Sequence, residues 1–320
     1  MSKPLLSICI PTYNRADYLR NCLLSIVDQE GFEDIEVVIS DNCSNDNTES
    51  VGKQYEQEYD NIIYYRNEDN IADKNFPLVL QRANGVLRKL TNDTIVYKPG
   101  AIKYMLDAVK ENIYERPQVY FLNKDIKRKS PMHYQELEEY VGNISFLLTW
   151  IGSISIWEDD SDDLATFTDN TDSKLAQVPF LIEHFEKHNG AMVYANQIME
   201  EIIPKNKNLS YGLYQVFYIN FMSYIKTLVM QKKISSNCYD KVRKNLLMDF
   251  FCPWIINQKY NKNGFIFSED EDLPRLILNE YKNEPYFFRY KLKLSIMNIK
   301  KILHNTVTST LTTTLHTLNK

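Results

Sequence analysis

The stretch LSICIPTYNRADYL, residues 6–19, joins a short apolar run to a helical pattern through a polar loop. Leu5–Ile10 has the apolar, β-branched character of a buried strand, and Pro11 ends it. From Ala16 to Val27, apolar residues recur at the three- and four-residue spacing of an amphipathic helix. The stretch therefore predicts a strand, a polar turn and a helix, in that order.

The same alternation continues to about residue 122. Strands are predicted at Ile35–Ile39, Ile62–Tyr65, Val86–Leu90, Thr94–Tyr97 and Val119–Leu122, with helices over 46–59, 75–83 and 101–110. Alternation of this kind predicts an α/β fold with a largely parallel sheet covered by helices. Beyond Pro204 the sequence turns to long helical stretches rich in tyrosine and leucine. We therefore expect a catalytic or binding domain over 1–203 and a helical C-terminal region over 204–320.

Composition narrows the class of protein. The chain has 320 residues, of which 44% are hydrophobic and 25% charged, and these values exclude a wholly disordered chain. A net charge of -5 argues against a nucleic-acid-binding protein. No run of about 18 apolar residues predicts a membrane span, and the N-terminus lacks a signal-peptide pattern. Five cysteines without CxxC spacing favour a reduced, cytoplasmic protein.

Ligands of parallel sheets bind beyond the carboxyl ends of the strands. That rule brings together three loops: Pro11–Arg15, Asp41–Asp46, and the segment around Asn92 and Asp93. They hold what a sugar-nucleotide site needs: an acceptor for a base N–H at Asp41, polar groups for a ribose, and oxygen ligands for a divalent cation. The predicted nucleotide-binding residues are Pro11, Thr12, Tyr13, Asn14, Arg15, Asp41, Asn42, Ser44, Lys74 and Asn92. For Lys74, a solvated side chain is favoured over a phosphate contact.

Four segments carry a family resemblance: LSICIPTYNRADYL, IEVVISDNCSNDNT (35–48), NEDNIADKN (67–75) and ANGVLRKLTNDTIVYKPGAI (83–102). Their order and spacing resemble glycosyltransferase family 2, whose members have the GT-A fold. Within it the chain is most similar to bacterial surface-polysaccharide enzymes of the abequosyltransferase-like type. The resemblance implies an inverting single displacement, in which a sugar leaves a nucleoside diphosphate for an acceptor hydroxyl. UDP is the expected nucleotide, with dTDP, GDP and CDP as alternatives.

Two positions depart from the family pattern. The family's acidic metal motif is reduced here to Thr91-Asn92-Asp93-Thr94, so the resemblance leaves Asp93 as the acid that would hold Mn²⁺ or Mg²⁺ and act in catalysis. The family's catalytic base is expected at Ala176-Gln177, where glutamine cannot act as a base. Asp172, the nearest carboxylate upstream, becomes the candidate base.

Other candidates lie between 150 and 190. Trp150 suits an acceptor pocket, because aromatic faces stack on sugars, although an apolar core strand would also contain it. The acidic run Glu158–Asp163 is interpreted as a solvated loop, with a base as the alternative. His184 and His188 have the spacing of metal ligands, but with no third ligand nearby they are interpreted as ordinary histidines.

The segment 286–303 mixes five basic residues with apolar ones and contains no acid. This composition is typical of a basic amphipathic helix on an anionic membrane surface, and the alternative is a helix packed on the catalytic domain. The resemblance adds a lipid-linked or polymeric glycan acceptor at the inner face of the bacterial membrane. We therefore expect a cytoplasmic or peripheral glycosyltransferase of capsule or O-antigen synthesis. The alternative is a degenerate nucleotide-sugar-binding or scaffold protein of a polysaccharide assembly complex.

Overall fold

The main sheet is built from the strands that the sequence predicts first. In the computed structural model, which describes residues 3–123, 130–202, 207–208, 211–260, 265–266 and 272–318, its strand order is β3-β2-β1-β4-β8. The strands are β1 (Leu6–Thr12), β2 (Ile35–Asp41), β3 (Ile62–Arg66), β4 (Leu87–Leu90) and β8 (Ser155–Trp157). The first four run parallel, and β8 pairs antiparallel with β4. The predicted parallel sheet is therefore confirmed.

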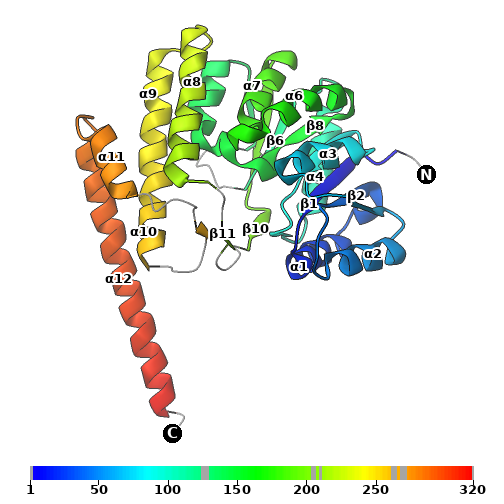
Figure 1. The fold of residues 1–320 in the computed structure, drawn as a ribbon, viewed down its shortest axis with the longest axis horizontal. Helices are drawn as coiled ribbons and strands as arrows, with labels where there is room; N and C mark the ends of the chain where they lie inside the picture. Colours follow the sequence, from blue (N-terminus) through cyan, green and yellow to red (C-terminus); the bar gives the residue numbers. More distant parts are fainter. Residues whose placement is uncertain are drawn as a thin grey trace.

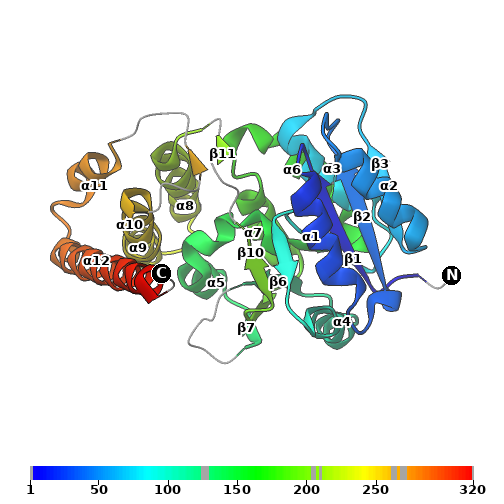
Figure 2. The same cartoon turned by 90° about the horizontal axis from the view of Figure 1, so that it is seen from below.

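Helices cover both faces of this sheet (Figures 1 and 2). Along β1, Ile8 and Ile10 belong to one buried cluster and Cys9 to the other, as the two-residue period of a strand requires. The first cluster includes side chains of α1, α2 and α4, and the second includes those of α3. These helices are α1 (Ala16–Val27), α2 (Thr48–Glu58), α3 (Asn75–Arg82) and α4 (Ala101–Asn112).

Smaller sheets extend the body. Strands β6 (Gln118–Leu122), β9 (Ala191–Ala195) and β7 (Met132–Tyr134) form a second sheet. The predicted strand β5 (Ile95–Tyr97) pairs antiparallel with β10 (Met199–Glu201) instead of joining the main sheet. A two-residue pair, β11 (Lys207–Asn208) with β12 (Phe265–Ile266), completes the strands of the described residues. The connecting helices are α5 (Leu137–Ile144), α6 (Leu164–Asp169) and α7 (Gln177–Lys187).

The C-terminal region is helical, as predicted. Its α-helices are α8 (Phe221–Met230), α9 (Ser236–Asn245), α10 (Cys252–Tyr260), α11 (Leu273–Tyr281) and α12 (Phe287–Leu318). Two π-turns, Gln215–Asn220 and Leu246–Phe251, precede α8 and α10. The larger hydrophobic cluster contains side chains from both this region and the N-terminal part, from Cys9 to Tyr290. The expected boundary between 203 and 204 lies outside the described residues.

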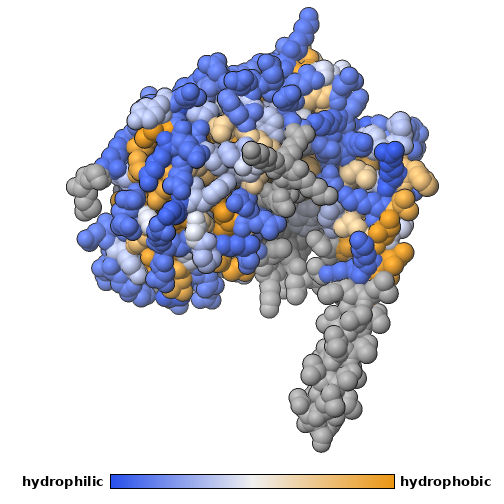
Figure 3. Space-filling model, turned by 180° about the vertical axis from the view of Figure 1, so that it is seen from behind, coloured by the Kyte–Doolittle hydropathy of each residue, from blue (hydrophilic) through white to orange (hydrophobic). Residues whose placement is uncertain are grey.

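The last helix extends beyond the body for much of its length (Figure 1). Over its described side chains, Phe288, Leu292, Ile296, Ile299 and Ile302 are exposed. Figure 3 shows this apolar surface beside hydrophilic residues, next to the grey end of the helix. Among the described residues, no helix has the length and apolarity needed to cross a membrane.

The side chain of Arg243 in α9 contacts residues of α11 and of the turn that follows it. Its guanidinium donates to the carbonyl oxygen of Glu280 at 2.9 Å, pairs with the carboxylate of Glu284, and lies 4.5 Å from the ring centroid of Tyr281. The Arg243 side chain is only 12% exposed, so removing it leaves the carboxylates of Glu280 and Glu284 without their largely buried partner.

We expect Arg243→Ala to lower the free energy of unfolding by roughly 3 kcal/mol, the lower end for breaking a buried ion pair, because both glutamates are partly exposed. Urea unfolding followed by circular dichroism measures this. Lys241→Ala, at an exposed position on the same helix, is the control and should change stability by less than about 0.5 kcal/mol. Equal effects of the two substitutions would contradict the anchoring role.

Candidate functional site

The loops that follow β1 and β2 are bonded to each other. The backbone N–H of Asn14 donates to Ser44 Oγ at 2.8 Å, and Asn14 Oδ1 accepts from the N–H of Asn45 at 2.7 Å. Asp46 accepts from the N–H of Ala16 at 3.1 Å and from that of Thr48 at 2.9 Å. One carboxylate thus binds N–H groups at the starts of both α1 and α2. Burial opposes the charge of Asp46, but these hydrogen bonds outweigh it and lower its pKa.

Asp41, the expected base acceptor, is fully buried at the end of β2. Its carboxylate accepts from the N–H of Ser44 at 2.9 Å, from Tyr64 Oη at 2.6 Å and from the Arg66 guanidinium at 3.2 Å. Burial and the bond to this carboxylate raise the pKa of Tyr64, so the phenol remains a donor. Asp41 does not line the cavity described below, whereas its neighbour Asn42 does.

Asp93 lies where the loop after β4 meets the loop after β1. It is 3% exposed, and its Oδ2 accepts from Thr12 Oγ1 at 2.9 Å. Its Oδ1 accepts from Arg15 Nη1 at 2.7 Å, which makes an ion pair. The expected convergence of these loops is therefore present in the geometry, with a carboxylate and a guanidinium in contact at its centre.

A cavity of about 750 Å³ opens over this junction. Of the expected nucleotide-binding residues, Pro11, Thr12, Tyr13, Arg15, Asn42 and Asn92 line it, together with Asp93 and the expected acceptor residue Trp150. Asn14 and Ser44 lie behind this wall and join the two loops. Lys74 is exposed and is not part of the lining.

The opposite wall is aromatic, and part of it comes from the C-terminal region. Phe217 lies in one π-turn and Phe250 in the other, with their ring centroids 4.8 Å apart. Phe250 also lies 5.5 Å from Phe146 and 6.1 Å from Trp254, measured between ring centroids. All four line the cavity. Short π-helical segments within helices are frequent at functional sites. These residues were not predicted from the sequence.

The carboxylates of the cavity are not those expected for a base. Asp172 is exposed in a 3₁₀ turn and does not line the cavity. Gln177 does line it, and its Nε2 donates to the carbonyl oxygen of Thr149 at 2.8 Å. Lys174, also in the lining, pairs with Asp73 at 2.8 Å. Asp73 therefore lies on the Gln177 side of the cavity, although it is distant in sequence.

A buried lysine holds two of the lining loops together. Lys89 Nζ donates to the carbonyl oxygen of Gly152 at 2.9 Å and to Thr91 Oγ1 at 3.2 Å. Burial lowers the pKa of Lys89 to about 7, against the attraction of Cys22 and Cys9. Its amine thus joins the loop of Asn92 and Asp93 to the turn beside Trp150.

The acidic run contains a second group of ionisable side chains. Its interpretation as a solvated loop is wrong for Asp160, which is 1% exposed. The interpretation that His184 has no third ligand nearby is also wrong, because Asp160 and Asp163 both lie against it. These residues are more than twenty positions from His184 in sequence, so spacing alone could not reveal the cluster. None of the three lines the cavity.

Known glycosyltransferases are similar to this chain in sequence, chiefly in its N-terminal part. Residues 7–148 match the family Glycosyl transferase family 2. Abequosyltransferase RfbV of Salmonella typhimurium is 49% identical over 84 residues, which are 25% of this chain and 25% of that protein. A GalNAc(5)-diNAcBac-PP-undecaprenol beta-1,3-glucosyltransferase of Campylobacter jejuni is 38% identical over 66 residues, 21% of each chain. The matching segments thus span about a quarter of the length of these curated relatives.

Solved structures resemble nearly the whole chain in fold. A mannosyltransferase from Pyrobaculum calidifontis in complex with GDP-Man and Mn2+ has a TM-score of 0.54 at 14% identity, covering 93% of this chain and 88% of that one. S. aureus TarS 1-349 in complex with UDP-GlcNAc has a TM-score of 0.52 at 16% identity, covering 92% and 89%.

Proposed function

We propose that the chain transfers a sugar from a nucleotide diphosphate donor to a bacterial surface glycan, because it has the GT-A fold and residues 7–148 match Glycosyl transferase family 2. The observation that carries the proposal is the cavity onto which the loops after β1, β2 and β4 converge. The donor is a UDP-sugar in this proposal, and the acceptor is a hydroxyl of a capsule or O-antigen glycan. The reaction inverts the anomeric carbon in one displacement.

The donor lies across the strand ends. Tyr13 offers an aromatic face that is 40% exposed, and Asn42 offers polar groups to the base and ribose. Asp41 has an indirect, positioning role. Its bonds to Ser44, Tyr64 and Arg66 fix the loop that carries Asn42. Arg15 supplies positive charge toward the diphosphate.

Asp93 and the donor's phosphate oxygens suit Mn²⁺ or Mg²⁺. Such ions are commonly bound by one or two carboxylates together with substrate phosphates. When bound, the ion neutralises charge on the departing diphosphate. Because Arg15 already carries part of that task, we expect metal dependence to be weaker than for a site with several acids.

The acceptor lies against the aromatic wall. Sugar rings stack on flat apolar faces, and the wall presents such faces on Trp150, Phe146, Phe217 and Phe250.

The base that takes the proton of the acceptor hydroxyl is Asp73 in this proposal, rather than Asp172. Asp73 lines the cavity on the side where Gln177 stands in place of an acid, whereas Asp172 lies outside.

The experiment combines binding and transfer. Thermal unfolding of the full chain with a panel of nucleoside diphosphates and nucleotide sugars, with and without Mn²⁺, should show a rise in Tm for one donor class. Incubation of a labelled donor of that class with lipid-linked glycan acceptors should then show transfer. Donor binding without transfer to any acceptor would support the scaffold alternative. No shift with any nucleotide would contradict the donor site.

We further propose that α12 binds the cytoplasmic face of the bacterial membrane. Its exposed apolar residues share the helix with the exposed bases Arg289, Lys291 and Lys300, and Phe287–Leu303 contains no acid. An anionic lipid surface complements both features, and it would place the cavity near a lipid-linked acceptor.

The full chain should therefore sediment with phosphatidylglycerol vesicles and not with phosphatidylcholine vesicles. Replacing Arg289, Lys291 and Lys300 by glutamine should weaken binding on the order of 100-fold, at about 1 kcal/mol for each basic residue near the surface. The matched control replaces Lys53, Lys103 and Lys110, which lie on helices of the N-terminal domain. An equal loss in the control would show that net charge, and not α12, drives binding.

A further inference from the structure

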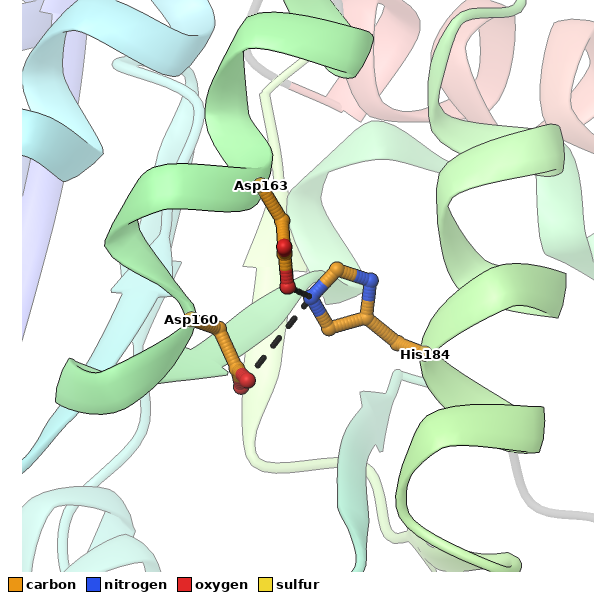
Figure 4. Close-up of side chains that lie close together, drawn as sticks. All are labelled: Asp160, Asp163 and His184. Atoms are coloured by element: carbon orange, nitrogen blue, oxygen red, sulfur yellow. Dashed lines mark ion pairs between the residues drawn. The ribbon is translucent and has the colours of Figure 1, made fainter.

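Two carboxylates and an imidazole meet between the acidic segment and α7 (Figure 4). Asp160 and Asp163 belong to the 3₁₀ turn Glu158–Asp163, and His184 belongs to α7. One ligand atom from each lies within 4.8 Å of the others. Asp160 is 1% exposed and His184 is 3% exposed, whereas the side chain of Asp163 is 38% exposed. The group is thus buried on one side and open on the other.

The ring of His184 is oriented by a backbone carbonyl. Its Nδ1 lies 2.9 Å from the carbonyl oxygen of Phe180, which can only accept, so Nδ1 carries the proton. Nε2 has no hydrogen-bond partner in the part of the chain that the structure describes. It lies 3.3 Å from Asp163 Oδ2 and 4.0 Å from Asp160 Oδ2, toward which it points in Figure 4.

This orientation leaves a buried lone pair facing two carboxylates. The carboxylate oxygens repel this lone pair unless a cation lies between them and Nε2. Metal-bound histidines characteristically donate their other ring N–H to a carbonyl or carboxylate, as His184 does to Phe180.

Two further side chains, Lys187 and His188, contact the carboxylates of this group. Lys187 Nζ lies 2.8 Å from Asp160 Oδ1 and 2.6 Å from Asp163 Oδ2, so an ammonium already balances part of the negative charge. The Lys187 side chain is 45% exposed and can turn into solvent. His188 Nε2 lies 3.0 Å from both oxygens of Asp160 and fixes their orientation.

We propose that His184, Asp160 and Asp163 bind a divalent transition-metal ion, Zn²⁺ in preference to Mg²⁺, through His184 Nε2 and one oxygen of each carboxylate. Imidazole nitrogen with carboxylate oxygen is a common zinc ligand set, whereas Mg²⁺ prefers oxygen alone. The ion joins the acidic turn after β8 to α7, the helix that begins at Gln177 in the cavity wall. Its role is structural, because its three ligands lie outside the cavity.

The test is zinc-dependent stabilisation of the full chain after removal of metal with a chelator. At a free Zn²⁺ concentration of about 100 times the Kd, Tm should rise by about 5 °C, and calorimetric titration should show the same site. Asp163→Asn, at the partly exposed ligand, should weaken Zn²⁺ binding by more than about 10-fold. His184→Gln should do the same if it folds, and Mg²⁺ should not replace Zn²⁺.

Two further variants separate this site from others. Asp162→Asn, at an exposed position in the same turn, should leave the Zn²⁺ response unchanged. Lys187→Met removes the competing ammonium, so it should lower Tm without metal and tighten Zn²⁺ binding. If Zn²⁺ shifts Tm equally in the wild type and in Asp163→Asn, the ion binds elsewhere on the chain and the proposal is overturned. Failure of Zn²⁺ to bind Lys187→Met would also overturn it, because that variant keeps all three proposed ligands.

Discussion

Replacing Asp93 by alanine should reduce the rate of sugar transfer by about 10²–10³-fold, the loss typical of removing one group that stabilises charge in a transition state. Asp93 is the carboxylate at the junction of the loops after β1 and β4, where it holds Thr12 and Arg15. Without it, Arg15 loses its partner and the donor's phosphates lose a metal ligand. Initial rates with a labelled donor would measure the effect.

Two further variants test whether the effect depends on the charge at position 93. Asp93→Asn keeps a side-chain oxygen for Thr12 but loses the charge, so it should fold like the wild type and remain impaired in transfer. Asp107→Ala, at an exposed position on α4, should retain the wild-type rate. Full activity in Asp93→Asn would show that neither the charge nor a metal at this position is required.

Asp73→Asn should reduce transfer by about 10²-fold or more, because a positioned general base contributes about 10²–10⁴-fold. Asp172→Asn should retain the wild-type rate, since Asp172 is exposed and outside the cavity. The same preparations should still show the rise in Tm with donor nucleotide, which would separate a chemical defect from a binding defect.

The ion pair between Asp73 and Lys174 requires its own control. Lys174→Met breaks the pair but leaves the carboxylate, so it should cost less activity than Asp73→Asn. If Asp172→Asn is the inactive variant and Asp73→Asn is not, the base is Asp172, as the sequence predicts.

Much of the fold could be predicted because its signals are local. The predicted helix Ala16–Val27 has the same bounds in the structure, and the strand predicted at Ile35–Ile39 extends only to Asp41. Both depend on apolar periodicity within a few residues. The pairing of β5 with β10 could not be predicted, because the partner strands lie about a hundred residues apart and neither has a distinctive pattern.

Part of the candidate site could also be predicted from the sequence, and part could not. Thr12, Arg15 and Asp93 were predicted from strand-end loops, whose position follows from the topology of a parallel sheet. The contact of Asp73 with Lys174 joins residues 101 positions apart, and π-turns have no local sequence signature that would place Phe217 or Phe250 in a cavity wall. Long-range packing decides these contacts.

The two parts of the cavity lining come from different segments of the chain, so the specificity for donor and for acceptor could change separately. The loops proposed to hold the donor lie within residues 7–148, whereas Phe217, Phe250 and Trp254 lie in a separate, later part of the chain. If the later segment binds the acceptor as proposed, substitutions in it or its exchange should alter which glycan is modified, while the proposed donor loops stay unchanged. A chimera that keeps the first segment and borrows the helices of a relative would turn this separation into a route for engineering glycan specificity.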